Sequence, residues 1–236
     1  MGGGAAPFNI LSQDRNMYFD YTVLAKYLPY FLPAAWMTIK VTTLGIILGL
    51  GLGLGTSFLR ISERRLLNLP ARAYIYIIRG TPLLLQLLFI YFGLRSVAGL
   101  DALTSAVLAL GIHNGAYIAE IFRGAIVSIS EGQMEAARSL GMPYQRAMLR
   151  IVLPQAFKRA IPSLGNQFII ALKDSSLAST ITINELLLKS QQLASSNFMM
   201  MEMLFIAALF YLLYTAIFSK TFRMIEARLD VDNQPA

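Results

Sequence analysis

The stretch EAARSLGMPYQRAMLRIVLP, from Glu135 to Pro154, differs from the long apolar stretches of its chain because polar and charged residues recur through it. It holds three arginines, a glutamate, a glutamine and a serine, and its apolar runs are three residues long at most. The whole chain is 56% hydrophobic and 14% charged, with a mean hydropathy of +0.57. A soluble domain is about 25% charged, so the composition predicts a membrane protein with a polar segment between two hydrophobic spans.

Five segments are long and apolar enough to cross a membrane, which takes a helix of about 20 residues. They are Pro33–Leu59, Ala73–Val97, Ala102–Ile126, Ala160–Ile183 and Met201–Thr221. The segment Met17–Phe31 is rich in tyrosine and phenylalanine, and is expected to form a helix at the membrane surface, where such rings prefer to lie. The expected fold class is an all-α membrane protein with five transmembrane helices and an N-terminal interfacial helix.

Basic residues are unevenly distributed between these spans. Thirteen lie on one side, in the loop 60–72, the segment 123–159 and the C-terminal end, and four lie on the other, at Arg15, Lys26, Arg95 and Lys189. Because cytoplasmic loops carry the excess of Lys and Arg, we expect the N-terminus outside, the C-terminus inside and the polar segment in the cytoplasm. The net charge of +7 is spread between apolar runs and forms no basic patch beside aromatic residues, so no nucleic-acid partner is expected.

Composition also limits the chemistry of the chain. The absence of cysteine excludes disulfides, thiol chemistry and Cys-based metal sites. A single histidine, His113, excludes a multi-histidine metal cluster and is interpreted as an interior residue. No catalytic residue and no metal ligand is therefore assigned. An intramembrane enzyme such as a protease, or an ion channel, is the alternative; the first lacks a G-x-S-x-G motif and the second a filter-like sequence.

The segment 127–159 is too long for a tight turn and too polar to enter the membrane. Good helix formers occupy 135–140, and Gly141 followed by Pro143 is typical of a helix end. From 145 to 153 the apolar residues return close to a helical period. The pattern predicts a helix, a sharp break and a second helix, which together would project into the cytoplasm and bind a partner.

These residues resemble a known loop. The residues that match the EAA loop of bacterial ABC importer membrane subunits are Glu135, Ala136, Ala137, Gly141, Ile151, Leu153 and Pro154. The stretches IIRGTPLLLQ (77–86), GAYIAEIFRGAI (115–126) and KDSSLAS (173–179) are similar to the polar amino acid uptake permeases, which include histidine and glutamine systems. The resemblance covers 34–226 and implies a type I ABC importer (MetI-like) permease fold in the bacterial cytoplasmic (inner) membrane.

The resemblance implies a permease subunit that takes up polar L-amino acids and is no enzyme by itself. It implies a separate ATP-binding subunit, a second permease chain, alike or different, and an extracytoplasmic amino-acid-binding protein. ATP and Mg are expected on the ATPase partner, and no cofactor on this chain, which has no G-x-x-x-x-G-K-[ST] loop. The residues expected to couple to the ATPase are Glu135, Ala136, Ala137, Leu140, Gly141 and Pro154.

The implied division of the chain has three parts. Residues 1–32 form an extracytoplasmic segment with the interfacial helix, 33–226 form the five-helix transmembrane domain with its coupling loop at 127–159, and 227–236 form a cytoplasmic tail.

Charged side chains within membrane spans are costly and indicate function. Four that lie within the predicted spans sum to zero: Arg79, Glu120, Lys173 and Asp174. We hypothesise an amino-acid site in which Arg79 binds the α-carboxylate and Glu120 or Asp174 binds the amino group. Further polar contacts are expected from Asn114, Tyr117 and Asn166. The alternatives are that Arg79 and Glu120 pair with each other, or that the charges serve assembly alone.

Glycines recur every four residues in the first span, at Gly45, Gly49 and Gly53. Small residues at this spacing let two helix backbones approach closely in lipid. The pattern leaves two interpretations open: a packing face within one chain, or a contact with a second subunit.

Overall fold

The computed structural model describes residues 21–229, and they are helical over most of their length. The long helices are α1 (Tyr21–Ile61), α2 (Arg65–Arg79), α5 (Ala102–Val127), α8 (Leu153–Asp174) and α10 (Met200–Arg228). The shorter ones are α3 (Leu83–Leu88), the π-helix η1 (Phe89–Gly93), α4 (Leu94–Ala98), α6 (Glu131–Ser139), α7 (Tyr144–Ala147), the π-helix η2 (Met148–Val152), the 3₁₀-helix η3 (Ser175–Ile181) and α9 (Leu186–Asn197). The predicted all-α class is confirmed.

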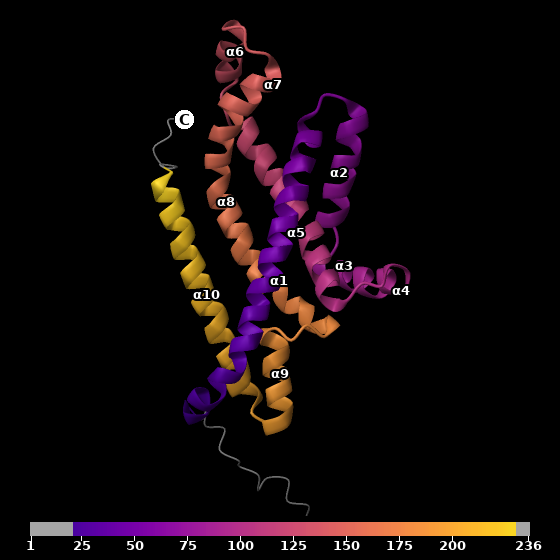
Figure 1. The fold of residues 1–236 in the computed structure, drawn as a ribbon, viewed down its shortest axis with the longest axis vertical. Coiled ribbons are helices and arrows are strands. Elements are labelled where there is room, and N and C mark those ends of the chain that lie inside the picture. The colour runs from indigo at the N-terminus through magenta and orange to yellow at the C-terminus, as the bar shows by residue number, and fades with distance from the viewer. Residues whose placement is uncertain (1–20, 230–236) are drawn as a thin grey trace, which may run out of the picture.

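The long helices form an elongated bundle (Figure 1). Helices α6 and α7 lie at one end of it, and α9 lies at the other end beside the start of α1. Within the described residues, α1, α5 and α10 are long and apolar enough to cross a membrane, and α2 together with α3 and η1 would make a fourth span, bent by 105°. Helix α8, which holds most of the predicted span Ala160–Ile183, is not among them. The predicted number of five spans is therefore not confirmed.

The N-terminal end of α1 corrects one expectation. We predicted a separate surface helix over Met17–Phe31, but from Tyr21 onward these residues belong to α1, which continues without interruption to Ile61. Phe31 is fully buried and its ring stacks on that of Phe210 in α10, with the centroids 6.1 Å apart. Burial of this aromatic side chain against α10 stabilises a continuous helix. Residues 17–20 lie outside the described residues.

The glycines of the first span pack within the chain. A Cβ atom added at Gly45 would lie 2.8 Å from the Cβ of Leu110, and one at Gly53 would lie 2.6 Å from Ile118. Helix α5 also has a glycine at this contact: a Cβ atom added at Gly115 would lie 3.0 Å from the Cβ of Leu52. Close backbone approach of this kind maximises van der Waals contact where apolar burial provides no driving force. Of the two interpretations, the structure supports packing of α1 on α5.

At the end of the bundle opposite α6, a buried carboxyl group joins several elements. The side chain of Glu185 has no exposed surface. It accepts hydrogen bonds from the backbone N–H groups of Leu187 and Leu188, at 2.9 and 2.8 Å, and from the hydroxyl of Tyr211 in α10, at 2.9 Å. The next N–H, of Leu186, lies 3.3 Å from the hydroxyl of Thr38 in α1. This arrangement caps the N-terminus of α9 and attaches it to α1 and α10.

Candidate functional site

Arg79 is the last residue of α2, directly before a sharp break in the second predicted span. The chain turns at Gly80, Thr81 and Pro82, and α3 leaves at 105° to α2. Pro82 favours the break, since a proline lacks the N–H that a helix needs and pushes the preceding residue out of the helical conformation. The predicted span Ala73–Val97 is therefore two helices, with Arg79 presented at the corner.

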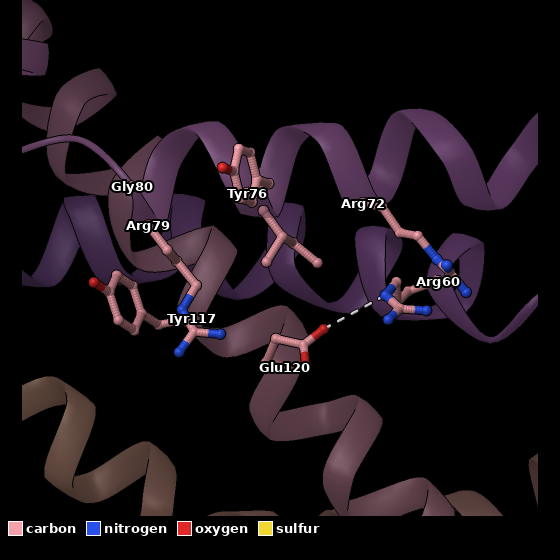
Figure 2. A pocket seen from close by; sticks show the side chains of 8 residues that line it. Arg60, Arg72, Tyr76, Arg79, Gly80, Tyr117 and Glu120 are labelled. Carbon is pink, nitrogen blue, oxygen red and sulfur yellow. Dashed lines mark ion pairs between the residues drawn. The ribbon is translucent and has the colours of Figure 1, made fainter.

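Arg79 lines a cavity of about 540 Å³ between α1, α2 and α5 (Figure 2). Its lining residues are Arg60, Arg72, Ile75, Tyr76, Arg79, Gly80, Tyr117 and Glu120. The guanidinium of Arg79 lies over the ring of Tyr117, 5.0 Å from its centroid. Three of the seven predicted substrate residues, Arg79, Tyr117 and Glu120, therefore meet in one cavity.

Glu120 is engaged by two arginines other than Arg79. Its carboxylate lies 2.9 Å from Nη2 and accepts a 3.0 Å hydrogen bond from Nε of Arg123, one turn along α5. Nε of Arg60, at the end of α1, lies 3.7 Å from the other oxygen (Figure 2). The suggested ion pair between Arg79 and Glu120 is not formed. The cavity therefore carries more guanidinium groups than carboxylates, which favours a carboxylate ligand.

The other four predicted substrate residues lie elsewhere. Asn114 is fully buried, donates to the carbonyl of Leu110 at 2.8 Å and accepts from Nε2 of Gln167 at 2.8 Å. Its amide therefore joins α5 to α8 and does not line the cavity. The remaining three are on α8 outside the cavity lining: Asn166 and Lys173, which are exposed, and Asp174, which is half-buried. Asp174 is the last residue of α8, directly before the 3₁₀-helix η3.

Arg72 and Arg60 also line the cavity, although from the sequence both were expected to be loop charges. Arg72, Tyr76 and Arg79 lie at four- and three-residue spacing, so they share one face of α2, and this pattern was visible in the sequence. Arg60 had no such signal because its partner Glu120 is 60 residues further along the chain.

The polar segment forms the predicted helix, break and second helix. Helix α6 ends in a closed cap: the N–H of Met142 bonds to the carbonyl of Ala137 at 3.1 Å, and the N–H of Gly141 to that of Arg138 at 2.9 Å. Gly141 has a φ of +82°, which an L-residue with a side chain adopts only at a cost. Helix α7 then starts after Pro143. We call residues Glu131–Ala147 the elbow.

The predicted coupling residues occupy different faces of the elbow. Ala137 is 5% exposed, and α6 packs on η2. Glu135, Ala136, Leu140 and Gly141 are exposed, and Leu140, at 85%, is a large apolar side chain with almost no contact in this chain. Pro154 lies outside the elbow, in the first turn of α8. Its missing N–H is consistent with the π-helical segment that precedes it.

Comparison with known protein families decides what kind of protein this is. Residues 42–231 match the family described as the inner membrane component of binding-protein-dependent transport systems. The chain belongs to this family. It is a permease subunit of an ABC importer, a transport component whose ATPase is a separate chain, and neither an intramembrane enzyme nor a channel is favoured.

Three similar proteins make the relationship specific. The permease is 38% identical over 218 residues to the glutamine transport system permease protein of Escherichia coli strain K12, covering 91% of this chain and all of that one. It is 36% identical over 230 residues to the L-cystine transport system permease protein of Bacillus subtilis strain 168, with 97% and 93% coverage. A crystal structure of an amino acid ABC transporter with histidines matches with a TM-score of 0.83 and 40% identity, over 90% of this chain and all of that one.

The fold is also that of a more distant importer. An inward-facing methionine ABC transporter matches with a TM-score of 0.77 at 18% identity, covering 86% of this chain and 98% of that chain. At this identity the likeness shows the fold alone. Together with the family match, it confirms the predicted MetI-like permease fold. The family and its apolar helices also make the permease a membrane protein.

Proposed function

We propose that this permease takes up polar L-amino acids across the bacterial cytoplasmic membrane. Two permease chains, identical or related, would line the path, each bound to one ATP-binding subunit, and an extracytoplasmic amino-acid-binding protein would deliver the substrate. ATP and Mg would be bound by the ATPase, with no cofactor and no metal on the permease. The names of the relatives support the substrate class, because they transport glutamine, cystine and arginine.

The proposed orientation has the N-terminus outside and the elbow and C-terminus in the cytoplasm, as the distribution of Lys and Arg favours. In this arrangement 1–32 is an extracytoplasmic segment, 33–226 the transmembrane domain with its loop at 127–159, and 227–236 a cytoplasmic tail. The structure is consistent with it, because α1 and α10 both start at the end that holds α9 and both run toward the end that holds the elbow (Figure 1).

The observation that carries the proposal is the elbow, in which α6 projects past the ends of the long helices and exposes Leu140 (Figure 1). We propose that α6 is the coupling helix and sits in a cleft of the ATP-binding subunit. The exposed Ala136 and Leu140 lie one turn apart on the same face and would make the contact, while Ala137 holds α6 on its own chain. Glu135 and Gly141 would set the ends of the contact.

In the substrate pathway, Arg79 would bind the α-carboxylate through its two parallel N–H groups. Tyr117 would shape the site beside it. Glu120 would reach the amino group only by giving up part of its pairing with Arg60 and Arg123. The α8 residues Asn166, Lys173 and Asp174 would form a second set of contacts further along the path, and Asn114 would position α5.

Reconstitution tests the transport function. Proteoliposomes that hold the permease and its ATP-binding subunit, with the binding protein outside, are expected to take up labelled polar amino acids when ATP is inside. Competition by the twenty amino acids then identifies the substrate. Uptake that persists without the ATP-binding subunit, or an absence of uptake of any amino acid, would contradict the proposal.

Labelling tests the orientation separately. The chain has no cysteine, so a single Leu140→Cys substitution gives one reactive site. An impermeant maleimide is expected to label it in inside-out vesicles and not in intact cells. Labelling from outside would place the elbow on the wrong side of the membrane.

A further inference from the structure

The corner at Gly80–Pro82 opens several carbonyl groups that a continuous helix would satisfy. The carbonyl of Tyr76 keeps its helical bond from the N–H of Gly80, at 3.0 Å, whereas that of Ile77 accepts from the hydroxyl of Thr81 at 2.9 Å. In hydrocarbon each unsatisfied backbone group costs several kcal/mol. A break inside a membrane span therefore needs a partner for every carbonyl that it frees.

Two further carbonyls at the corner, those of Ile78 and Thr81, lie within hydrogen-bond distance of one side chain, that of Gln86 on α3. Its Nε2 donates to the carbonyl of Ile78 at 2.8 Å, and lies 3.1 Å from the carbonyl and 2.8 Å from the hydroxyl oxygen of Thr81. Its Oε1 lies 3.1 Å from Nδ1 of His113 on α5. Because the amide nitrogen faces acceptors, the oxygen must face His113, and the proton between them belongs to Nδ1.

His113 connects this amide to the cavity. Its ring lies one turn before Tyr117 on α5, with the two centroids 5.1 Å apart. The guanidinium of Arg79 in turn lies over the ring of Tyr117, 5.0 Å from its centroid. The helices on both sides of the corner therefore contact the same stretch of α5. Arg79, at the end of α2, contacts Tyr117, and Gln86, on α3, contacts His113.

We propose that Gln86 is a positioning residue, which fixes the corner and so holds Arg79 at the cavity, with His113 as its partner. The role in transport rests on the proposed function, in which Arg79 binds the substrate carboxylate. Gln86 itself lines no part of the cavity and acts through the geometry of α2.

Gln86→Leu tests the proposal, since leucine keeps the bulk and removes both hydrogen-bonding groups. In reconstituted uptake, with labelled L-glutamine, L-arginine or L-cystine as the wild type prefers, KM is expected to rise about tenfold, or about 1.4 kcal/mol. The maximal rate and ATP hydrolysis are expected to change less than twofold. A fall in maximal rate with unchanged KM would overturn the proposal.

His113 provides a matched pair of variants. Asparagine places an N–H close to the position of Nδ1, so His113→Asn is expected to keep the wild-type KM. His113→Phe keeps the ring and loses the donor, and is expected to raise KM about as much as Gln86→Leu does. Equal KM values for the two His113 variants would contradict the role of the Gln86 contact.

A double-mutant cycle shows whether Gln86 acts through Arg79. In the Arg79→Ala background, Gln86→Leu is expected to raise KM no further, because coupled residues are not additive. Additive effects would overturn the proposal. If Gln86→Leu does not accumulate in the membrane, Thr81→Val serves in its place: it removes one hydroxyl of the same network and is expected to raise KM about threefold, corresponding to a weak hydrogen bond.

Thiol labelling tests the geometry without any substrate. Arg79→Cys creates the chain's single cysteine, and adding Gln86→Leu is expected to change its reaction rate with a charged thiol reagent at least threefold. Arg95→Cys, on α4, is the control and is expected to stay unchanged. If the wild type takes up no amino acid, the proposed function fails while these rates still decide the position of Arg79. Unchanged labelling at position 79 would overturn the positioning role.

Discussion

Two helix breaks in this permease are built on the same Gly-x-Pro pattern, Gly80–Pro82 between α2 and α3 and Gly141–Pro143 in the elbow. Each proline precedes a short α-helix with nearly the same backbone angles, φ −64° and ψ 138° at Pro82 and φ −64° and ψ 148° at Pro143. In both cases a π-helical segment follows. The two breaks therefore differ in what supports them rather than in how the next helix starts.

The support differs with the surroundings. At the elbow the backbone closes on itself, through Gly141, which is exposed and has φ +82°, and through the N–H of Met142. At the corner, Gly80 has a φ of −87°. There the hydroxyl of Thr81 and the amide of Gln86 donate hydrogen bonds to the backbone carbonyls of Ile77 and Ile78. A break within a membrane span thus requires side-chain partners that a break at the exposed elbow does not, because lipid offers no hydrogen bonds.

The comparison predicts separate defects: the elbow should affect the ATPase and the corner should affect the substrate. The largest effect is expected from Leu140→Glu, which places a charge on the exposed tip of the elbow. Loss of an interface anchor costs about 2 kcal/mol, so binding of the ATP-binding subunit should weaken about 30-fold in a binding assay on purified subunits.

Leu66→Glu is the matched control for the elbow. Leu66 is 90% exposed and lies at the start of α2 beside the other turn at this end of the bundle. It is expected to leave ATPase binding unchanged. An equal loss with both variants would mean that the elbow is not the specific contact.

Arg79→Ala is expected to have the next largest effect and to act on substrate alone. A hydrogen-bonded pair with a charged group contributes about 1.5–3 kcal/mol, so KM for uptake should rise about 20-fold while ATPase binding is kept. The control is Arg95→Ala, since Arg95 also covers a tyrosine ring, 5.1 Å from the centroid of Tyr91, but lies outside the cavity. A similar KM change in both variants would argue against a carboxylate site at Arg79.

The two glycines should respond differently to asparagine, which tolerates positive φ. Gly141→Val should reduce coupled uptake about tenfold, because a left-handed conformation costs about 1–2 kcal/mol in a residue with a side chain, and Gly141→Asn should restore most of it. Gly80→Asn should not be tolerated in the same way, since a Cβ at Gly80 would lie 2.8 Å from the carbonyl oxygen of Tyr76. Uptake rates of the three variants, with protein levels measured, test this difference.

The smallest effects are expected from Pro82→Ala and Pro143→Ala. Each break is held by several further hydrogen bonds, so uptake should fall about twofold or less, as expected when a weak local preference is removed. A tenfold loss of uptake at either proline would show that the proline, and not these hydrogen bonds, maintains the break.

How far the sequence predicted these features depends on how local their causes are. The elbow was predicted because Gly141 and Pro143 lie within three residues of each other in a polar segment. The same pattern at Gly80–Pro82 was hidden in a long apolar run, and the span Ala73–Val97 was interpreted as a single helix. Likewise, Phe31 looked like a surface aromatic because its partner Phe210 lies 179 positions away.

The cavity was predicted in part for the same reason. Tyr117 and Glu120 are three residues apart and share a face of α5, so their association was visible. The more distant contacts were not visible in the sequence. Arg60 pairs with Glu120 from another helix, and Gln86 contacts His113 across 27 residues of sequence. Asn114 was chosen as a substrate contact because it is polar, whereas the structure uses its amide to hold Gln167.

The buried carboxyl group of Glu185 limits how this permease can change shape. Its three donors come from α9 and α10, and the adjoining N–H reaches α1. Pulling these helices apart would strand an acidic side chain among apolar neighbours. We therefore expect α1, α9 and α10 to move together at this end during transport, with bending confined to the segments outside them.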